Sequence, residues 1–221
     1  MEQAHWCDGD KRGMLECTQQ GIGQISQNEF AKEIEKYATD TNNKTFLEIG
    51  TWNGLGSTKA FVNALSKRTD NYVFYSLECN KDKVRLAQKL YRNFNNVHIL
   101  NEVIWNQTPS DFYQIFPECK VDATYKRWNE IDILNMQQCE LFLTRTNLPN
   151  IFDVLLLDGG EFTTFYEYHI LKNKCKIVML NGTNTNKYKL IVNDIRLSKQ
   201  WNILKESNEQ NGYMIAQKKY M

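Results

Sequence analysis

A glutamate lies near the end of an apolar stretch, immediately before a turn that is rich in glycine. Residues 46–58 read FLEIGTWNGLGST, and the acid is Glu48. A carboxylate inside a core strand costs several kcal/mol of desolvation unless a cationic group offsets that cost. The sequence therefore predicts that Glu48 lies close to a positively charged group.

Further acidic and amide side chains follow the other apolar stretches. Glu78 ends the stretch YVFYSLE, Asp158 and Glu161 flank a glycine pair after FDVLLL, and Asn181 follows KIVML. The carboxyl ends of parallel strands meet at one edge of an open α/β sheet, where ligands bind. We therefore expect these side chains to share one site, with Glu78 placed to accept hydrogen bonds from ribose hydroxyls.

Two nucleotide cofactors fit a glycine turn after the first strand, and the residues favour S-adenosylmethionine. A dinucleotide places its pyrophosphate at a G-x-G-x-x-G turn, whereas the spacing here is G-x-x-x-G-x-G and Glu48 would repel a pyrophosphate. S-adenosylmethionine carries a sulfonium and an ammonium, which Glu48 would attract, and its carboxylate can cap the helix start near Ser57. Trp52 adds a ring that attracts a cation, worth about 0.5–2 kcal/mol.

The acids that follow the fourth strand are candidates for a general base. An aliphatic or sugar hydroxyl needs a base within about 2.6–3.2 Å of its oxygen before it can accept a methyl group. Asp158 is the first candidate and Glu161 the second. The alternatives are a turn-forming Asp-Gly pair and an ordinary acid in the first turn of a helix. His169 is a further catalytic candidate, although its place on the apolar face of a helix also fits a core residue.

Two other features can contribute to an acceptor site. Lys187 follows the fifth strand and can meet an acceptor oxygen, unless it is a solvated residue at a helix start. His5 and Trp6 can fold over the site as a lid, or belong to a segment without fixed structure. In YKRW, residues 125–128, aromatic and basic side chains suit stacking on a sugar as well as a solvated face.

Charge and composition exclude several classes of function. The 221 residues include 27 Lys and Arg against 26 Asp and Glu, so no electrostatic field steers the chain to nucleic acid or to an anionic membrane. No segment has the roughly eighteen apolar residues of a membrane span, and the N-terminus lacks an apolar signal region. The six cysteines form no C-x-x-C pair, which favours reduced thiols in the cytoplasm over disulfides or a zinc site.

Apolar strands alternate with helical patterns along most of the chain. A helix is expected over residues 28–38, introduced by a capping box of Ser26 and Glu29. The later elements are strands over 45–49, 72–78, 97–100, 152–158 and 176–180, and helices over about 56–67, 81–94, 162–170 and 187–199. WNILKE and GYMIAQK flank an Asn-Gly pair and predict an antiparallel hairpin. The order predicts a Rossmann-like, doubly wound α/β fold with a mostly parallel seven-stranded sheet, helices on both faces and a C-terminal β-hairpin.

The pattern divides the chain into two parts. Residues 1–44 are expected to form an irregular segment and a helix, a candidate lid, and residues 45–221 the α/β domain. The segment 105–150 is too long for a plain crossover between strands, and its apolar residues predict one helix or two. We expect this insertion to form the acceptor pocket or an oligomer contact, such as the interface of a homodimer.

The motifs FLEIGTWNGLGST, FYSLECN and FDVLLLDGGEF resemble those of class I S-adenosylmethionine-dependent methyltransferases, over about residues 45–218. Within that class the chain is most similar to small O-methyltransferases associated with sugar and polysaccharide modification in bacteria and large DNA viruses. The resemblance implies that the first glycine turn binds the methionine end of the cofactor, that Glu78 binds the ribose and that residues 101–103 flank the adenine. The cofactor-binding residues are then Glu48, Gly50, Thr51, Trp52, Gly54, Ser57, Glu78, Cys79, Asn101, Glu102 and Asp158.

The chain departs from this resemblance at two positions that concern a metal ion. Many relatives have an aspartate at the end of the fifth strand, where this chain has Asn181, and a histidine shortly after the Asp-Gly of the fourth strand, where it has Glu161. In metal-dependent enzymes resembling catechol O-methyltransferase, acids at these strand ends hold Mg²⁺, which needs several oxygen ligands. Asp158 and Asn181 could still supply some ligands, with Glu161 and Asn184, but the missing acid disfavours a metal.

The sequence thus predicts an enzyme that transfers a methyl group from S-adenosylmethionine to an oxygen by in-line displacement, with an Asp or Glu as general base. The acceptor implied by the resemblance is a sugar hydroxyl in a glycan, and neither nucleic acid nor a membrane is an expected partner. Two alternatives stay open: metal-dependent methylation of a small catechol-like hydroxyl, and a non-catalytic module that binds a glycan or a protein. The expected location is the cytoplasm, or the host cytoplasm if the protein is viral.

Overall fold

The computed structural model describes residues 25, 28–107, 112–115, 120, 122–209 and 211–219. The candidate lid residues His5 and Trp6 and the candidate cap Ser26 lie outside this part of the chain. The first described helix, α2 (Glu29–Thr39), has Asn28 as its N-cap, whose side chain accepts a hydrogen bond from the backbone N of Ala31 at 2.8 Å.

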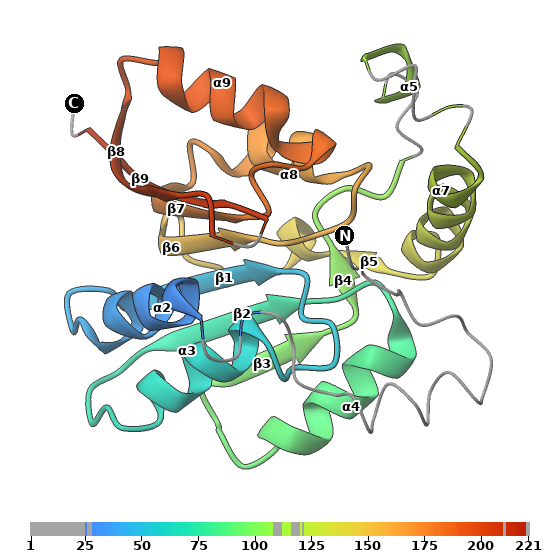
Figure 1. The fold of residues 1–221 in the computed structure, drawn as a ribbon. Helices are drawn as coiled ribbons and strands as arrows, with labels where there is room; N and C mark the ends of the chain where they lie inside the picture. Colours follow the sequence, from blue (N-terminus) through green and yellow to red (C-terminus); the bar gives the residue numbers. More distant parts are fainter. Residues whose placement is uncertain are drawn as a thin grey trace.

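A seven-stranded sheet forms the centre of the molecule, in the order β3-β2-β1-β6-β7-β9-β8 (Figure 1). Its strands are β1 (Thr45–Ile49), β2 (Val73–Leu77), β3 (Val97–Leu100), β6 (Phe152–Leu157), β7 (Cys175–Asn181), β8 (Trp201–Ser207) and β9 (Tyr213–Lys218). Neighbouring strands pair in parallel along the series β3, β2, β1, β6 and β7, and β9 pairs antiparallel with both β7 and β8. The predicted Rossmann-like sheet with a C-terminal antiparallel hairpin is confirmed.

The chain order reverses between β1 and β6, which is the switch point where ligands bind in such sheets. From β1 the chain moves outward through β2 to β3, and β6 returns to the other side of β1 before β7 continues away from it. At the carboxyl ends of these two strands the backbone N of Asp158 donates to the carbonyl of Ile49 at 2.8 Å. The two halves of the sheet therefore meet at the residues that the motifs singled out.

Helices cover both faces of the sheet because strand residues alternate between them. Phe46 lies in one core cluster with α2, α3 (Ser57–Leu65) and α4 (Lys81–Tyr91). Its neighbour Leu47 lies in a second cluster with α8 (Thr164–Leu171), the short helix η2 (Asn186–Tyr188) and α9 (Lys189–Leu197). Glu48 shares the strand face of Phe46, so its side chain points into the α2–α4 side.

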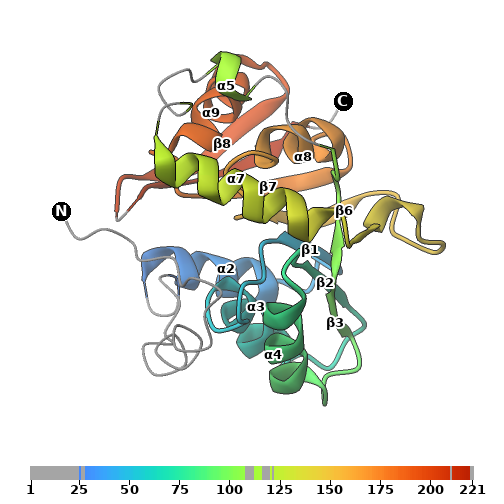
Figure 2. The same ribbon diagram turned by 90° about the vertical axis from the view of Figure 1, so that its right-hand side faces the viewer.

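The insertion between β3 and β6 holds the elements that the sequence left open. Two short strands, β4 (Glu102–Val103) and β5 (Glu140–Leu141), pair in parallel as a separate sheet that the sequence analysis did not foresee. Between and after them lie α5 (Phe112–Ile115), α7 (Ala123–Met136) and the short helix η1 (Phe142–Thr144). Figure 2 shows α7 running across the edge of the molecule toward which the arrowheads of β1, β2 and β3 point in Figure 1. This helix therefore lies over the carboxyl ends of the strands.

Within the described residues, none of the helices combines the length and the apolar character needed to cross a membrane.

Candidate functional site

The glycine turn after β1 adopts backbone conformations that suit its residues. Gly50 and Gly54 have φ angles of +98° and +81°, in the left-handed region that favours glycine, and Trp52 also lies in that region with a φ of 52°. A Cβ atom on Gly50 would lie 2.2 Å from the carbonyl oxygen of Asp158. The backbone N–H groups of Gly50 and Thr51 both donate to the carbonyl of Leu77, at 2.9 and 3.1 Å. The turn is thereby fixed against β2 on one side and β6 on the other.

Glu48 is fully buried beneath this turn, with an exposed fraction of 0%. Its Oε2 atom accepts hydrogen bonds from the hydroxyls of Thr58, at 2.6 Å, and Ser76. Its Oε1 atom has no hydrogen-bond partner in the described structure. Burial raises the pKa of Glu48 to about 7, although the hydroxyls of Ser57, Ser76 and Thr58 oppose the rise. One carboxylate oxygen is thus left to interact with a ligand or to carry a proton.

Glu78 follows β2 and ties two turns together with its carboxylate. Its Oε2 accepts from the backbone N of Trp52 at 2.8 Å, and its Oε1 accepts from the backbone N of Asn80 at 2.8 Å. Burial raises the pKa of Glu78, and these hydrogen bonds oppose the rise. Each carboxylate oxygen can accept more than one hydrogen bond, so Glu78 remains able to bind hydroxyl groups of a ligand.

A lysine covers Trp52, the ring expected to attract a cationic ligand. The Nζ atom of Lys83, in the first turns of α4, lies 3.7 Å from the centre of the Trp52 ring. Its charge also lowers the pKa of Glu78. The place of Lys83 could not be expected from the sequence, because a lysine near a helix start usually faces solvent.

Asn101 and Cys79, which the resemblance places beside the adenine, lie together at the ends of β3 and β2. The Nδ2 atom of Asn101 donates to the carbonyls of Glu78 and Cys79, both at 2.9 Å. Glu102, predicted to bind the cofactor, does not join them: its carboxylate pairs with the guanidinium of Arg145, whose Nε lies 2.7 Å from Oε2. As a residue of the short strand β4, Glu102 points toward the insertion instead of the strand ends.

Asp158 lies at the end of β6, beside both Asn181 and Lys187. The Nδ2 atom of Asn181 donates to its Oδ2 at 3.1 Å, and the Nζ atom of Lys187 lies 3.7 Å from its Oδ1. Burial raises the pKa of Asp158 to about 6, while the charge of Lys187 acts in the opposite direction. A carboxylate with a pKa close to neutrality can both accept and release a proton under physiological conditions.

Glu161 and Lys187 are joined through the backbone. The Oε1 atom of Glu161 accepts from the backbone N of Lys187 at 3.2 Å, and the Nζ of Lys187 donates to the carbonyl of Gly159 at 2.8 Å. Burial raises the pKa of Glu161, and the charge of Lys187 opposes the rise. Lys187, whose side chain is 11% exposed, is therefore a largely shielded member of the site and not a solvated residue at a helix start.

Two further acids reach the same region from helices, and the sequence analysis named neither. Glu167 of α8 is 3% exposed, its Oε2 has no hydrogen-bond partner in the described structure, and that atom lies 2.9 Å from a Cβ built on Gly159. Asp132 of α7 places its Oδ2 3.0 Å from a Cβ built on Gly160. Burial raises the pKa of each to about 7. The two glycines leave the space in which these carboxyl groups lie.

Aromatic side chains border these acids on the side of α7. Tyr125 and Trp128 lie one turn apart on α7 with their ring centres 5.3 Å apart, and Tyr125 is 6.3 Å from the ring of Phe162. The hydroxyl of Tyr125 accepts from the Nδ2 atom of Asn186 at 3.3 Å, one residue from Lys187. The site therefore has an acidic floor at the strand ends and an aromatic wall on the insertion.

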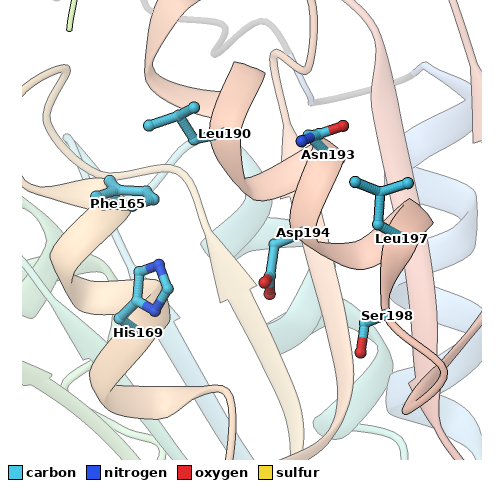
Figure 3. Close-up of a pocket in the computed structure, with 7 residues that line it drawn as sticks. All are labelled: Phe165, His169, Leu190, Asn193, Asp194, Leu197 and Ser198. Atoms are coloured by element: carbon cyan, nitrogen blue, oxygen red, sulfur yellow. The ribbon is translucent and has the colours of Figure 1, made fainter.

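His169 does not lie with the acids, so its position does not support a catalytic role. It lines a surface hollow of about 470 Å³ between α8 and α9, where its ring packs edge-on against Phe165 at 4.5 Å and Asp194 lies across the hollow (Figure 3). Burial and the charge of Lys172 lower its pKa. His169 lies on a helix face, as its apolar spacing predicted. Its packing fits the interpretation as a core residue better than the catalytic one.

The residues at the strand ends do not fit a magnesium ion. Asp158 and Asn181 are hydrogen-bonded to each other, and the nearest cation to Asp158 in the described part of the chain is the ammonium of Lys187. Magnesium requires several free oxygen ligands in octahedral geometry. Among the described residues, no three His, Cys, Asp or Glu side chains come together as a metal site would require.

Solved structures of methyltransferases share this fold. An O-methyltransferase from Bacillus cereus in complex with SAH (S-adenosylhomocysteine) has a TM-score of 0.60 and 11% identity, covering 93% of this chain and 88% of that one. The O-methyltransferase TomG from Streptomyces achromogenes, involved in tomaymycin synthesis and solved with SAM, has a TM-score of 0.57 and 10% identity, covering 97% and 92%. A methyltransferase from Geobacter sulfurreducens has a TM-score of 0.54 and 9% identity, covering 99% and 91%.

No protein-family model matches the sequence, and no curated protein matches it. At identities near one residue in ten, the structural likeness establishes the fold. What the site does must therefore be argued from its own residues.

Proposed function

We propose that this protein is an S-adenosylmethionine-dependent O-methyltransferase whose acceptor is a sugar hydroxyl in a glycan. The observation that carries the proposal is the group of carboxylates around the switch point of a methyltransferase-like sheet, with the fully buried Glu48 and the half-buried Glu78 and Asp158 at the ends of three adjacent strands. Such a group favours a cationic ligand and disfavours a pyrophosphate, because opposite charges stabilise the ionised form of each acid. S-adenosylmethionine matches this charge.

The residues after β1, β2 and β3 suit the methionine end, the ribose and the adenine of this cofactor, respectively. The unpartnered oxygen of Glu48 supplies negative charge at the methionine end, beside the start of α3. Glu78 keeps acceptor capacity for the ribose hydroxyls, and the turn held by Asn101 borders the adenine. Replacing Glu48 by Gln should weaken S-adenosylmethionine binding by about 1–3 kcal/mol, the range for a charged hydrogen bond. Unchanged affinity in a titration of the variant would remove Glu48 from the site.

The residues after β6 suit proton removal from the acceptor. Bound S-adenosylmethionine supplies an electrophilic methyl group: its C–S bond breaks as the O–C bond forms, and the electron pair of the C–S bond stays on sulfur. Asp158 accepts the proton of the attacking hydroxyl, and Lys187, 3.7 Å away, favours the ionised form that can do so. Glu161 is the second candidate, since it also contacts Lys187, by accepting a hydrogen bond from its backbone N.

The aromatic wall and the acids together support a sugar as the acceptor. Aromatic rings stack on the apolar faces of sugar rings, and carboxylates accept hydrogen bonds from their hydroxyls. Tyr125 and Trp128 provide such rings next to Asp132 and Glu161. The sequence resemblance to sugar-modifying O-methyltransferases points in the same direction. A metal-dependent reaction is not favoured, because Lys187 already supplies the cation beside Asp158.

A methyl-transfer assay with a panel of acceptors tests this proposal. The purified chain would be incubated with methyl-labelled S-adenosylmethionine and neutral, amino and acidic oligosaccharides, or with catechol, each with and without EDTA. We expect label in an oligosaccharide, recovered as an O-methyl ether, at a rate that EDTA does not change. Label in catechol alone, lost with EDTA, would contradict the proposal. Cofactor binding without transfer to any acceptor class would favour the non-catalytic module.

A further inference from the structure

The stripe of α7 that faces the strand ends combines aromatic rings with one acid. Tyr125, Trp128 and Asp132 are half-buried at helical spacing, whereas their neighbours Lys126, Arg127 and Glu130 are exposed. The basic residues of YKRW therefore point away from this stripe. Asp132 ends close to Gly160, in the turn after β6. Burial raises its pKa, and the charges of Glu78 and Glu161 add to the rise.

The acceptor side of the site holds more negative charge than its lysine can balance. In the described part of the chain, Lys187 is the cationic side chain whose charge acts on Asp132, Asp158, Glu161 and Glu167. Its Nζ contacts Asp158 and the carbonyl of Gly159, and its backbone N binds Glu161. The cofactor of the proposed function brings one sulfonium, which must lie near Asp158 for transfer. One lysine therefore faces four acids, and it balances the charge of Asp132, Glu161 and Glu167 only in part.

Glu167 supplies independent evidence that a ligand group is missing from this region. Its carboxylate is 3% exposed and lies against the Gly159 turn, yet Oε2 has no hydrogen-bond partner in the described structure. A buried acceptor without a partner costs about 1–3 kcal/mol. A donor entering beside Gly159 and Gly160 would offset this cost, and a charged donor would offset it most.

We propose that the acceptor of this methyltransferase carries a protonated amino group beside the hydroxyl that is methylated, so that its chemical class is an amino sugar. The ammonium lies between Asp132 and Glu161 and against the rings of the α7 stripe, where carboxylates and aromatic faces both attract a cation. These acids keep the amine protonated, so its nitrogen has no free electron pair to attack the methyl group. Asp158 meanwhile removes the proton of the hydroxyl, which directs the methyl group to oxygen. This inference rests on the proposed function.

Three matched oligosaccharides test it: β-linked oligomers of glucosamine, glucose and glucuronic acid, which share a backbone and differ in charge. Each would be titrated at neutral pH into the 221-residue chain saturated with S-adenosylhomocysteine. We expect the glucosamine oligomer to bind about tenfold to a hundredfold more tightly than the glucose oligomer, as for a charged hydrogen bond, and the glucuronic acid oligomer to bind most weakly. Asp132→Asn should bring the glucosamine affinity close to that for glucose, whereas Glu130→Gln, on the exposed side of α7, should leave the preference unchanged.

The outcomes separate this inference from the function on which it rests. Equal affinity for glucosamine and glucose oligomers, or tighter binding of glucuronic acid, would overturn the amino-sugar acceptor while S-adenosylhomocysteine binding still supported the methyltransferase. A full preference retained in both Asp132→Asn and Glu161→Gln would place the ammonium elsewhere and overturn the assignment to these acids. Failure of the wild-type chain to bind S-adenosylhomocysteine would instead contradict the proposed function itself.

Discussion

The two sides of the site satisfy their buried acids in different ways. On the side of β1 and β2, Glu48 and Glu78 receive hydrogen bonds from hydroxyls and backbone N–H groups, all supplied by residues 52–80. On the side of β6, four acids from α7, the β6 turn and α8 gather around Lys187. The first side is organised before a ligand arrives, which suits an invariant cofactor. On the second side the acids outnumber the one lysine, which suits a substrate that must be selected and deprotonated.

The largest expected effect separates chemistry from binding at Asp158. Asp158→Asn should lower kcat by about a hundredfold to ten-thousandfold, because the acceptor hydroxyl loses the proposed general base, while affinity for S-adenosylhomocysteine changes little. Initial rates with the best acceptor, together with calorimetric titration, would measure both. Glu161→Gln serves as the matched control and should reduce kcat less. Full activity in Asp158→Asn would move the base to another residue.

A pair of glycine variants tests whether the close contact between the turn after β1 and the turn after β6, where the two sides meet, limits stability. Gly50→Ala forces a Cβ to within 2.2 Å of Asp158, at a φ of +98°. It should lower the free energy of unfolding by about 3 kcal/mol or more through strain and overpacking. Gly182→Ala has a similar φ of +88°, but its nearest atom lies 3.7 Å away, so only the backbone cost of about 1–2 kcal/mol applies. If denaturant unfolding showed equal losses of unfolding free energy for the two variants, the backbone near β6 would have moved to make room for the added Cβ.

The acids on the β6 side should contribute more to the pH dependence of stability than the acids on the side of β1 and β2. Folding raises the pKa of Glu48 and Glu167 from 4.5 to about 7, of Asp132 from 3.8 to about 7, and of Asp158 from 3.8 to about 6. Between those values the folded protein holds protons that the unfolded chain has released. The free energy of unfolding should therefore fall as the pH rises from about 4.5 to about 7, and then level off.

Thermal unfolding of the ligand-free protein over this range would measure the slope. Glu167→Gln should flatten it, because the amide does not titrate. S-adenosylmethionine should raise Tm more at the upper end of the range, where the acids it faces are ionised in its presence. A Tm that rose steadily with pH up to 7 would show that the buried acids ionise without cost.

The smallest expected effect concerns the lysine on the β1 side. Lys83→Met removes the ammonium 3.7 Å from the Trp52 ring, leaving that face to the sulfonium. Affinity for S-adenosylmethionine should then rise about twofold to fivefold, a cation–π contribution of about 0.5–1 kcal/mol, while affinity for uncharged-sulfur S-adenosylhomocysteine stays the same. Lys89→Met, an exposed position on α4, is the control. Equal shifts for both ligands would assign Lys83 a purely structural role.

Most of the fold could be predicted from the sequence because its signals are local. The near-continuous apolar run FDVLLL reads as a strand buried on both faces, and β6 is buried along its whole length. The Asn-Gly pair marked the hairpin of β8 and β9. The insertion was less predictable, because α7 has apolar residues on its exposed side, such as Leu134 at 61% exposure, so its sequence does not reveal its inward face.

The site was predictable where residues follow strands and not where they lie on helices. Glu48, Glu78, Asp158 and Glu161 could be placed because the ends of parallel strands converge. Asp132 and Glu167 could not, since each is one acid among several on a helix and only the tertiary packing buries it. The ion pair of Glu102 with Arg145 was equally hidden, because the strand of Glu102 belongs to the separate small sheet, which the sequence does not reveal.

The most direct test of the central claim is a calorimetric titration of the purified chain with S-adenosylhomocysteine, with and without EDTA and with NADH as the control. Our account predicts binding of S-adenosylhomocysteine that EDTA does not affect, and no binding of NADH, because the buried Glu48 and the half-buried Glu78 disfavour a pyrophosphate. Absence of binding from a folded sample, or binding of NADH instead, would contradict the assignment of these strand ends to a methyl-donor cofactor.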